Sequence, residues 1–335
     1  MSRIAVMGSG AWGTAIALSL ACRGGHEITL WSHTPEVSET IRERGENKSF
    51  LPGFPVPKSI QATSSIQEAL QNAEIIVSVM PSHHVRASYE QFAPHLKPGQ
   101  MLVSATKGVE DDSLLRMSEV IVQVLDGFGL QLPLSVLSGP SFAQEVAAGS
   151  PTAITIASQS ADLTTHIQQE FGSHTLRLYT NDDVVGVELG GALKNVIAIA
   201  TGIVSGLGLG HNSAAALITR GIVETTRLSV ACGGQRETLA GLSGIGDLIL
   251  TCTGALSRNR TVGIELGRGR KLPEILAGLH GKVAEGVRTA SAALGLARRY
   301  EVEMPITEQV YAILNEEKSP QEAMRELMSR PGRDE

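Results

Sequence analysis

Short apolar runs alternate with amphipathic stretches from residue 3 to about residue 180. Most of these runs carry several Val, Ile or Leu residues with little alternation, which is typical of strands that are covered on both faces. Alternation of such strands with helical stretches indicates parallel strands joined by crossover helices. The predicted strands are 4–7, 27–31, 74–80, 101–105, 134–137, 152–157 and 176–179.

After residue 182 the pattern changes to long helical periodicity with almost no strand signal. A chain of 335 residues exceeds the size at which one core keeps growing, so two domains are expected. We predict an α/β domain with a doubly wound sheet over residues 1–180. An all-α domain over 181–335 would hold the substrate and the catalytic groups. Its predicted helices are 184–205, 213–231, 258–267, 287–300, 306–315 and 320–328.

The charge pattern argues against nucleic acid as a partner. The net charge is −6, and the basic residues form no long run that could follow a phosphate backbone. Any phosphate that this chain recognises would therefore be small and held by a few placed groups. We expect a small-molecule substrate.

The cysteines and the amino terminus indicate the compartment. Cys22, Cys232 and Cys252 lie far apart, so neither a disulfide framework nor a metal site is indicated, and we expect no bound metal. The amino terminus enters the first strand directly, without the parts of a signal peptide. No apolar run approaches the roughly 18 residues of a membrane span. We expect a cytoplasmic protein without a membrane span.

A glycine turn follows the first predicted strand. The residues Gly8-Ser-Gly10-Ala11-Trp12-Gly13 lead into a helical stretch, the order of a dinucleotide-binding motif. The first glycine permits the tight turn, the second lets a pyrophosphate approach, and the third lets helix and strand pack closely. The helix start then favours the anion. A glycine turn that serves packing alone is the alternative, but it leaves the spacing of the three glycines unexplained. We therefore predict a Rossmann-like, NAD(P)-binding domain.

The end of the second strand bears on the choice of cofactor. No carboxylate stands there to bind the adenine ribose hydroxyls, so NADP is permitted as well as NAD. Ser32 and His33 are candidate donors to a 2′-phosphate. Both are equally well explained as solvated loop residues.

Candidate substrate groups follow two later strands, where ligands of open parallel sheets bind. Lys107 comes after one strand, and Gly139 and Ser141 come after another, in a turn that can present backbone amides and a hydroxyl. A surface lysine and ordinary turn formers are the alternatives.

Lys194 and Asp247 are candidates for proton transfer. Lys194 stands in a predicted helix among small and apolar neighbours, a dry setting that would lower its pKa from about 10.4, as would a nearby cation such as Lys107. Asp247 lies between glycines and an apolar run, where a lysine or a substrate hydroxyl would serve as its partner. A lysine that reaches solvent and a helix-capping aspartate are the alternatives.

Ser257, Arg258 and Asn259 stand at the start of a predicted helix. Ser257 can cap that helix, and the next two residues project from its first turn, where backbone amides favour an anion. The planar guanidinium of arginine suits phosphate oxygens. A capped helix with solvated arginines is the alternative to a phosphate site.

Together these segments closely resemble bacterial NAD(P)-dependent glycerol-3-phosphate dehydrogenase. The resemblance runs over nearly the whole chain, and the order and spacing of its motifs make it specific. The motifs are GSGAWGTA, NKSFLP, VMPSH, SATKG, SGPSFA, AAGSPTA, GVELGGALKNVIAIATG, GLSGIGDLILTCT, SRNR, VAEG and EMPITEQVY.

The resemblance implies an oxidoreductase that interconverts sn-glycerol 3-phosphate and dihydroxyacetone phosphate with NADP or NAD, and that supplies glycerophospholipid synthesis. It implies that Lys194 is the general base and acid. The implied substrate-binding residues are Lys107, Gly139, Ser141, Lys194, Asp247, Ser257, Arg258 and Asn259. The implied cofactor contacts are Trp12, His33, Lys107, Ala143, Arg258, Val283 and Glu285, in addition to the glycine turn with Gly8, Gly10, Ala11 and Gly13.

Two other functions remain as alternatives. A β-hydroxyacid dehydrogenase has a similar build and an α-domain lysine, but its substrates carry a carboxylate. A nucleotide-sensing module that has kept the fold without turnover is the second. The apolar helical domain could also supply the interface of a homodimer.

Overall fold

The computed structural model describes residues 1–279 and 283–332 and forms two compact units. The first comprises Met1–Lys107 and Leu115–Val187, and the second Gly108–Leu114 and Glu188–Glu335. The units divide between Val187 and Glu188. Because helix α8 begins at Val184, this division falls inside one continuous helical pattern and leaves no mark in the sequence.

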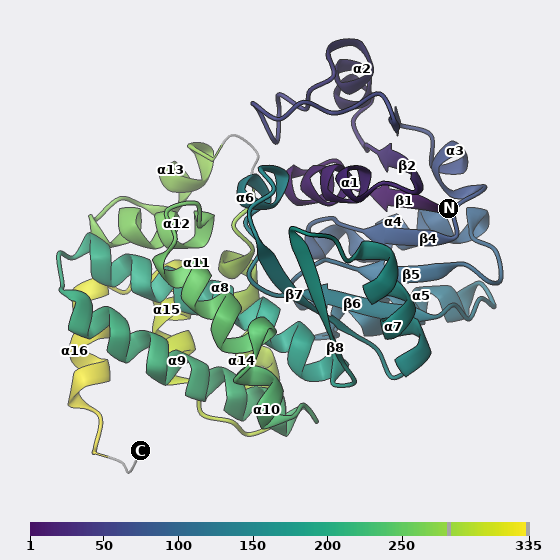
Figure 1. The fold of residues 1–335 in the computed structure, drawn as a ribbon. Coiled ribbons are helices and arrows are strands. Elements are labelled where there is room, and N and C mark those ends of the chain that lie inside the picture. The colour runs from purple at the N-terminus through teal and green to yellow at the C-terminus, as the bar shows by residue number, and fades with distance from the viewer. Residues whose placement is uncertain (280–282, 333–335) are drawn as a thin grey trace. The chain divides into compact units, whose positions relative to one another are not determined.

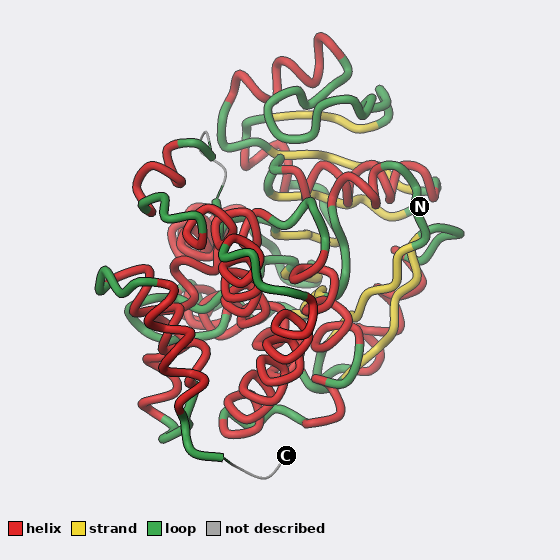
Figure 2. Tube along the Cα trace, turned by 90° about the vertical axis from the view of Figure 1, so that its left-hand side faces the viewer, coloured by secondary structure: helices red, strands yellow, loops and turns green. Residues whose placement is uncertain are grey.

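An eight-stranded sheet forms the centre of the first unit, with the strand order β3-β2-β1-β4-β5-β6-β7-β8 (Figures 1 and 2). All neighbouring strands are parallel except β6 and β7, which are antiparallel. The strands are β1 Ser2–Met7, β2 His26–Trp31, β3 Ile60–Thr63, β4 Ile75–Ser78, β5 Met101–Ser104, β6 Leu134–Ser138, β7 Thr152–Ala157 and β8 Leu176–Asn181.

The sheet departs from the sequence prediction at two places. Strand β3 was not predicted, because its four residues, IQAT, form no apolar run. The prediction of parallel strands throughout is wrong for β6 and β7. Their connection contains only the short helix α6, Ala143–Ala147, which packs against α1 instead of crossing the sheet, so β7 returns beside β6 in the opposite direction.

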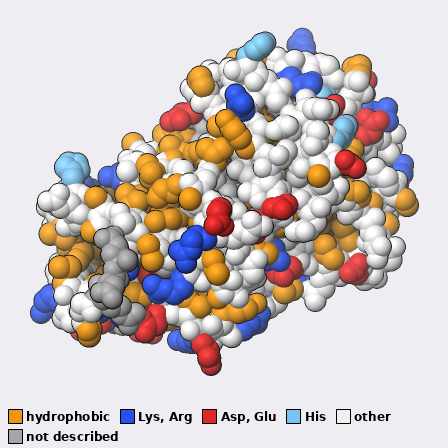
Figure 3. All heavy atoms as spheres, turned by 60° about the horizontal axis from the view of Figure 1, so that its bottom comes forward, with side chains coloured by type: hydrophobic (Ala, Val, Ile, Leu, Met, Phe, Trp, Pro, Cys, Tyr) orange, Lys and Arg blue, Asp and Glu red, His pale blue; other side chains and the backbone are white. Residues whose placement is uncertain are grey.

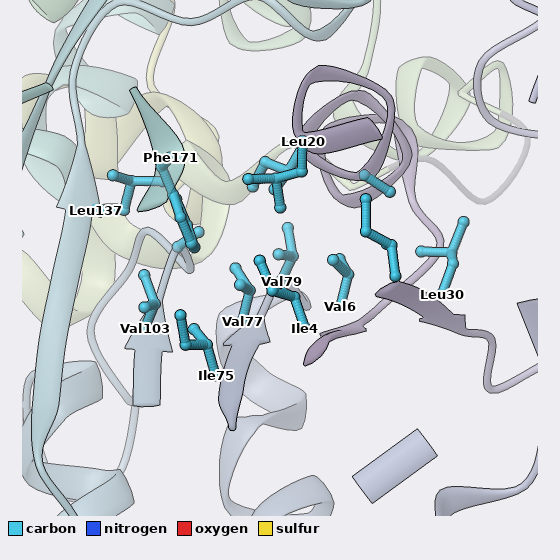
Figure 4. Packing of buried hydrophobic residues seen from close by; sticks show 14 of the residues in the cluster. Ile4, Val6, Leu20, Leu30, Ile75, Val77, Val79, Val103, Leu137 and Phe171 are labelled. Atoms are coloured by element: carbon cyan, nitrogen blue, oxygen red, sulfur yellow. The ribbon is translucent and has the colours of Figure 1, made fainter. Parts of the chain in front are cut away.

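Helices cover both faces of the sheet, so the predicted doubly wound α/β class is confirmed. One apolar cluster joins residues such as Ile4, Val6 and Val77 to helices α1, α2 and α7, and Figure 4 shows its centre. The cluster on the other face includes Ala5 and Met7 and joins them to α3, α4 and α5. The helices of this unit are α1 Ala11–Arg23, α2 Pro35–Arg44, α3 Ile66–Leu70, α4 Val85–Phe92, α5 Met117–Gly127, α6 and α7 Ala161–Phe171, with 3-10 turns η1 Ser82–His84 and η2 Ala93–His95.

The strand order reverses beside β1. Chain order runs outward through β2 and β3 on one side of β1 and through β4, β5 and β6 on the other. Ligands of such sheets bind beyond the carboxyl ends of the strands at this reversal. The glycine turn, which follows β1, therefore lies where a dinucleotide is expected.

The described part of the second unit is helical and is built around α8. Residues of α8 such as Val196, Ile199 and Ile203 lie in an apolar cluster with residues of α11, α12 and α15. All helices predicted for this half are present, and the glycine-rich stretch also folds into α10, η3 and α11. The helices are α8 Val184–Gly206, α9 His211–Ala231, α10 Arg236–Leu239, the π-helical turn η3 Leu242–Gly246, α11 Asp247–Thr253, α12 Arg258–Gly267, α13 Leu272–Ala277, α14 Glu285–Arg299, α15 Pro305–Asn315 and α16 Pro320–Ser329.

Helix α8 is long and apolar enough to cross a membrane, which corrects the expectation that no segment approaches that length. Its most apolar 18-residue window is wholly buried inside the protein, as in the core helix of a globular domain. The segments Arg236–Thr253 and Arg258–Gly267 meet the same criteria only when taken as one span bent by 49°.

A buried carboxylate links α9 to α15. Glu224, which is 2% exposed, accepts hydrogen bonds of 2.9 Å from the backbone N–H groups of both Ile306 and Thr307 in the first turn of α15. Burial raises the pKa of Glu224, and the hydrogen bonds from Thr307 and Ile306 oppose that rise. Glu224 thus stabilises the start of α15 while its own charge is costly to bury.

Candidate active site

The glycine turn after β1 is shaped by close backbone contacts. Gly8 has a φ of +133°, and a Cβ atom there would lie 1.9 Å from the carbonyl oxygen of Val79. A Cβ atom on Gly13 would lie 1.8 Å from the carbonyl oxygen of Gly8. A Cβ atom on Gly10 would meet nothing within 4 Å. The outer glycines are therefore required by packing, whereas the space beside Gly10 is left open.

The start of α1 has the features of a pyrophosphate site. Gly10 is its N-cap and no acidic side chain occupies the first turn, so nothing there repels an anion. The buried Nε1 of Trp12 has no hydrogen-bond partner among the described residues, which leaves a donor for a ligand. Ala11, Trp12 and Ala143 share one small apolar cluster, so α6 brings Ala143 beside this turn. These residues fit a dinucleotide.

Buried polar residues hold the glycine turn from behind. The hydroxyl of Ser32 accepts a hydrogen bond of 2.8 Å from Ser9 and donates one of 2.9 Å to the carbonyl of Thr34. Ser32 is 2% exposed, so it is not a donor to a 2′-phosphate, whereas His33 is exposed. Asn47 was not singled out from the sequence. Its Nδ2 donates to the carbonyl of Ser9 at 2.7 Å, and its only sequence signal is its place in the NKSFLP motif.

The residues predicted after β5 and β6 come together. The ammonium of Lys107 donates a hydrogen bond of 3.1 Å to the carbonyl of Gly139, and the hydroxyl of Ser141 donates to the same carbonyl at 3.0 Å. Gly139 has a φ of +136°, and a Cβ atom there would lie 3.0 Å from the Cα atom of Ile154. Lys107 is thus a half-buried, held lysine rather than a solvated one.

The lysine and the aspartate predicted for proton transfer form a buried ion pair. The Nζ of Lys194 lies 2.5 Å from Oδ1 of Asp247, and these residues are 8% and 0% exposed. Lys194 is therefore a buried lysine rather than a solvated one. Asp247 is the first residue of α11 rather than its cap. A Cβ atom on Gly190 would lie 2.5 Å from the carbonyl oxygen of Ser243. This glycine therefore lets the turn η3, which directly precedes Asp247, approach α8 closely.

The start of α12 is capped as predicted. The hydroxyl of Ser257 accepts a hydrogen bond of 3.2 Å from the backbone N–H of Arg260. Arg258 is exposed in the first turn. Surrounding protein atoms lower the pKa of its guanidinium and the Glu285 carboxylate opposes this, but an arginine stays charged at neutral pH. A cation and helix amides are thus available to an anion here.

The side chain of Asn259 points to other helices. Its Nδ2 donates to Oδ1 of Asn195 at 2.9 Å, and its Oδ1 accepts from the backbone N–H of Gly286 at 3.0 Å. The backbone amide and the second hydrogen of Nδ2 remain as donors at the start of α12. Asn195 was missed because it reads as one more polar residue beside Lys194. Val283 and Glu285, predicted to contact the cofactor, are both half-buried near the start of α14.

Each unit therefore holds one group of predicted residues. The first has the glycine turn, Lys107, Gly139 and Ser141, and the second has the pair of Lys194 and Asp247 and the start of α12. Among the residues that the structure describes, no three His, Cys, Asp or Glu side chains are placed to hold a metal ion. On the face drawn in Figure 3, basic and acidic side chains are interspersed.

Two family models match this chain, one in each half. Residues 3–164 match the model described as NAD-dependent glycerol-3-phosphate dehydrogenase N-terminus, and residues 183–325 match the corresponding C-terminus. The chain belongs to the NAD-dependent glycerol-3-phosphate dehydrogenase family. The resemblance seen in the sequence motifs is confirmed.

Relatives from this family match over the full chain. A glycerol-3-phosphate dehydrogenase [NAD(P)+] from Acidobacterium capsulatum is 68% identical and is covered completely, as is this chain. One of the same name from Koribacter versatilis is 60% identical over 99% of this chain and 98% of its own length. The crystal structure of glycerol-3-phosphate dehydrogenase from Coxiella burnetii has a TM-score of 0.93 at 39% identity, covering 98% of this chain and 99% of that one.

Proposed function

We propose that this chain catalyses reversible hydride transfer between NAD(P)H and dihydroxyacetone phosphate, giving sn-glycerol 3-phosphate. The observation that carries the proposal is the buried pair of Lys194 and Asp247, in a chain whose first unit has a dinucleotide-binding turn. A dry amine that can donate and accept a proton is what ketone reduction requires besides the hydride. The names of the bacterial relatives agree with this reaction.

Lys194 is the proposed general acid and base. In the reduction, its ammonium donates a proton to the carbonyl oxygen at C2 of dihydroxyacetone phosphate. In the oxidation, its neutral amine takes the proton of the C2 hydroxyl. The carboxylate of Asp247 holds the amine in place, since the two groups are in hydrogen-bond contact. Bound NAD(P)H or NAD(P)+ supplies or accepts the hydride.

The substrate phosphate is proposed to bind at the start of α12. The guanidinium of Arg258 and the backbone amides of the first turn offer a charge and donors to the phosphate oxygens. Holding the phosphate there fixes C2 and turns binding energy into orientation. We propose the substrate-binding set predicted from the sequence, in which Asn259 offers its backbone amide and the Nδ2 hydrogen that is not donated to Asn195. The set is Lys107, Gly139, Ser141, Lys194, Asp247, Ser257, Arg258 and Asn259.

The cofactor is proposed to bind along the glycine turn, with its pyrophosphate beside Gly10. Since the end of β2 carries no carboxylate and His33 is exposed, both NADP and NAD are accepted. The proposed contacts are Gly8, Gly10, Ala11, Trp12, Gly13, His33, Lys107, Ala143, Arg258, Val283 and Glu285.

The cellular context is also part of the proposal. We propose a cytoplasmic homodimer whose product enters glycerophospholipid synthesis. A reducing compartment agrees with the cysteines, since no disulfide joins Cys22, Cys232 or Cys252 in the described chain.

A substrate panel tests the proposed function. Purified protein is mixed with NADPH or NADH and either dihydroxyacetone phosphate or a set of β-keto acids, and the loss of absorbance at the nicotinamide band is followed. We expect turnover with dihydroxyacetone phosphate alone. Turnover only with the keto acids would support a β-hydroxyacid dehydrogenase, and cofactor binding without turnover would support a sensing module.

A further inference from the structure

Three helices of the second unit are joined by one chain of amide hydrogen bonds. Oδ1 of Asn195 on α8 accepts from Nδ2 of Asn259 on α12, and Oδ1 of Asn259 accepts from the backbone N–H of Gly286 on α14. Asn195 and Asn259 are 6% and 8% exposed, so the chain is largely shielded from water. We call these three residues the amide bridge.

Each member of the amide bridge directly follows a proposed site residue. Lys194 precedes Asn195, Arg258 precedes Asn259, and Glu285 precedes Gly286. Adjacent residues on a helix share one rigid backbone, so fixing the bridge fixes the starting points of all three side chains. The amide bridge thus joins the proton donor, the phosphate anchor and a cofactor contact.

The bridge leaves no room for movement at its third member. A Cβ atom on Gly286 would lie 2.6 Å from the carbonyl oxygen of Asn195 and 3.0 Å from Oδ1 of Asn259. The start of α14 therefore sits directly against the other two members. Any side chain at this position would push α14 away from them.

The backbones of α8 and α12 also touch, about two turns further along α8 and one turn further along α12. Cβ atoms on Gly202 and Gly206 would lie 2.9 Å from the Cα atoms of Gly263 and Gly267, respectively, so the two helices run in the same direction. Lys194 stands two turns before Gly202, about 12 Å, and α12 begins about 7.5 Å before Gly263. In this register Lys194 lies within about one helical turn of the level at which α12 starts. The amide bridge spans this distance.

We infer that Asn195 is a positioning residue: through Asn259 and Gly286 it sets the spacing between the amine of Lys194 and the phosphate site at the start of α12. This inference rests on the proposed function. Asn195 contributes an acceptor at this junction, and without it α12 is held to α8 further along the helices, by the glycine contacts and by the 3.5 Å hydrogen bond from Arg260 to Ser205. The substrate's phosphate and its reacting carbon would then no longer meet their two partners together.

Kinetics of Asn195→Ala, Asn259→Ala and the double variant test the inference. We expect each single variant to lower kcat for dihydroxyacetone phosphate and to raise its KM, with kcat/KM falling about 10- to 100-fold and the KM for NADPH changing less than about threefold. Both changes break the Asn195–Asn259 bond, and Asn259→Ala also breaks the bond to Gly286, so the double variant should lose little more than Asn259→Ala alone. Asn315→Ala is the matched control in the same unit, because the exposed Asn315 side chain donates to the carbonyl of Tyr311 in its own helix.

Gly286→Ala probes the same junction without deleting a polar group. Alanine favours helix, so this variant should fold, but its methyl group displaces α14 and with it Glu285. We expect Gly286→Ala to change the KM for NADPH more than the KM for dihydroxyacetone phosphate, which is the opposite of the pattern expected for Asn195→Ala. Equal losses for both substrates in every variant, or independent losses that multiply in the double variant, would overturn the positioning role. Absence of turnover in the wild-type protein would instead refute the proposed function.

Discussion

Replacing Lys194 tests stability and chemistry at the same time. Asp247 is fully buried and Lys194 nearly so, with 2.5 Å between their charged atoms. Lys194→Met fills similar space but leaves the Asp247 carboxylate buried without this cation. Removing one partner of a buried ion pair costs about 3–5 kcal/mol. At about 2–4 °C per kcal/mol, the midpoint of thermal unfolding should fall by about 6–20 °C.

A second change separates the two effects. In Lys194→Met combined with Asp247→Asn the buried charge is gone, so the midpoint should return to within about 4 °C of the wild-type value. In both variants turnover should be about 10²- to 10⁴-fold or more below the wild-type value, because no group replaces the proton donor. NADPH affinity should change little in either.

Thermal unfolding followed by circular dichroism and NADPH oxidation with dihydroxyacetone phosphate provide the two readouts. Near-normal turnover in Lys194→Met would refute the proton-transfer role of Lys194. A single variant as stable as the wild type would show that the buried-charge argument is wrong for this pair.

Three further predictions concern other parts of the chain. Gly10→Ala should weaken NADPH binding at least about tenfold and leave the unfolding midpoint unchanged. Gly13→Ala should also lower the midpoint, because a Cβ atom on Gly13 meets backbone whereas one on Gly10 does not. Equal midpoints for the two variants would contradict this. Arg258→Ala should raise the KM for dihydroxyacetone phosphate at least about tenfold in steady-state assays, with a smaller effect on kcat; an unchanged KM would exclude it as a phosphate anchor. The raised pKa of Glu224 means that the folded state holds this proton more tightly than the unfolded state. The stability that this group contributes is therefore lost as pH rises from the unfolded pKa of about 4.3 towards the folded value. In urea titrations over that pH range, Glu224→Gln should become more stable relative to wild type. A stability difference that does not change with pH would contradict this sign.

The two-domain plan was predictable because its signals are local. Buried parallel strands and amphipathic helices each imprint a period on the sequence, and strands such as β1 and β5 were located from it. The direction of β7 was not predictable, because it depends on where α6 packs. Strand β3 was missed since its neighbours in the sheet, rather than its composition, keep it extended.

The candidate site divides in the same way. Lys194 and Asp247 were chosen because a charge among apolar or glycine residues is unusual, and the ion pair explains both. The roles of Asn47, Asn195 and the side chain of Asn259 were not predictable. An amide carries no signal of burial in its own sequence, and its partners are set by how helices and turns meet.

Transfer of label to the product is the most direct test of the proposed reaction. NADPH carrying deuterium at the transferable C4 position is incubated with the purified protein and dihydroxyacetone phosphate, and the product is analysed by mass spectrometry and NMR. We predict sn-glycerol 3-phosphate with one deuterium at C2. Consumption of NADPH without deuterium at C2 of that product, or no product at all, would contradict the account.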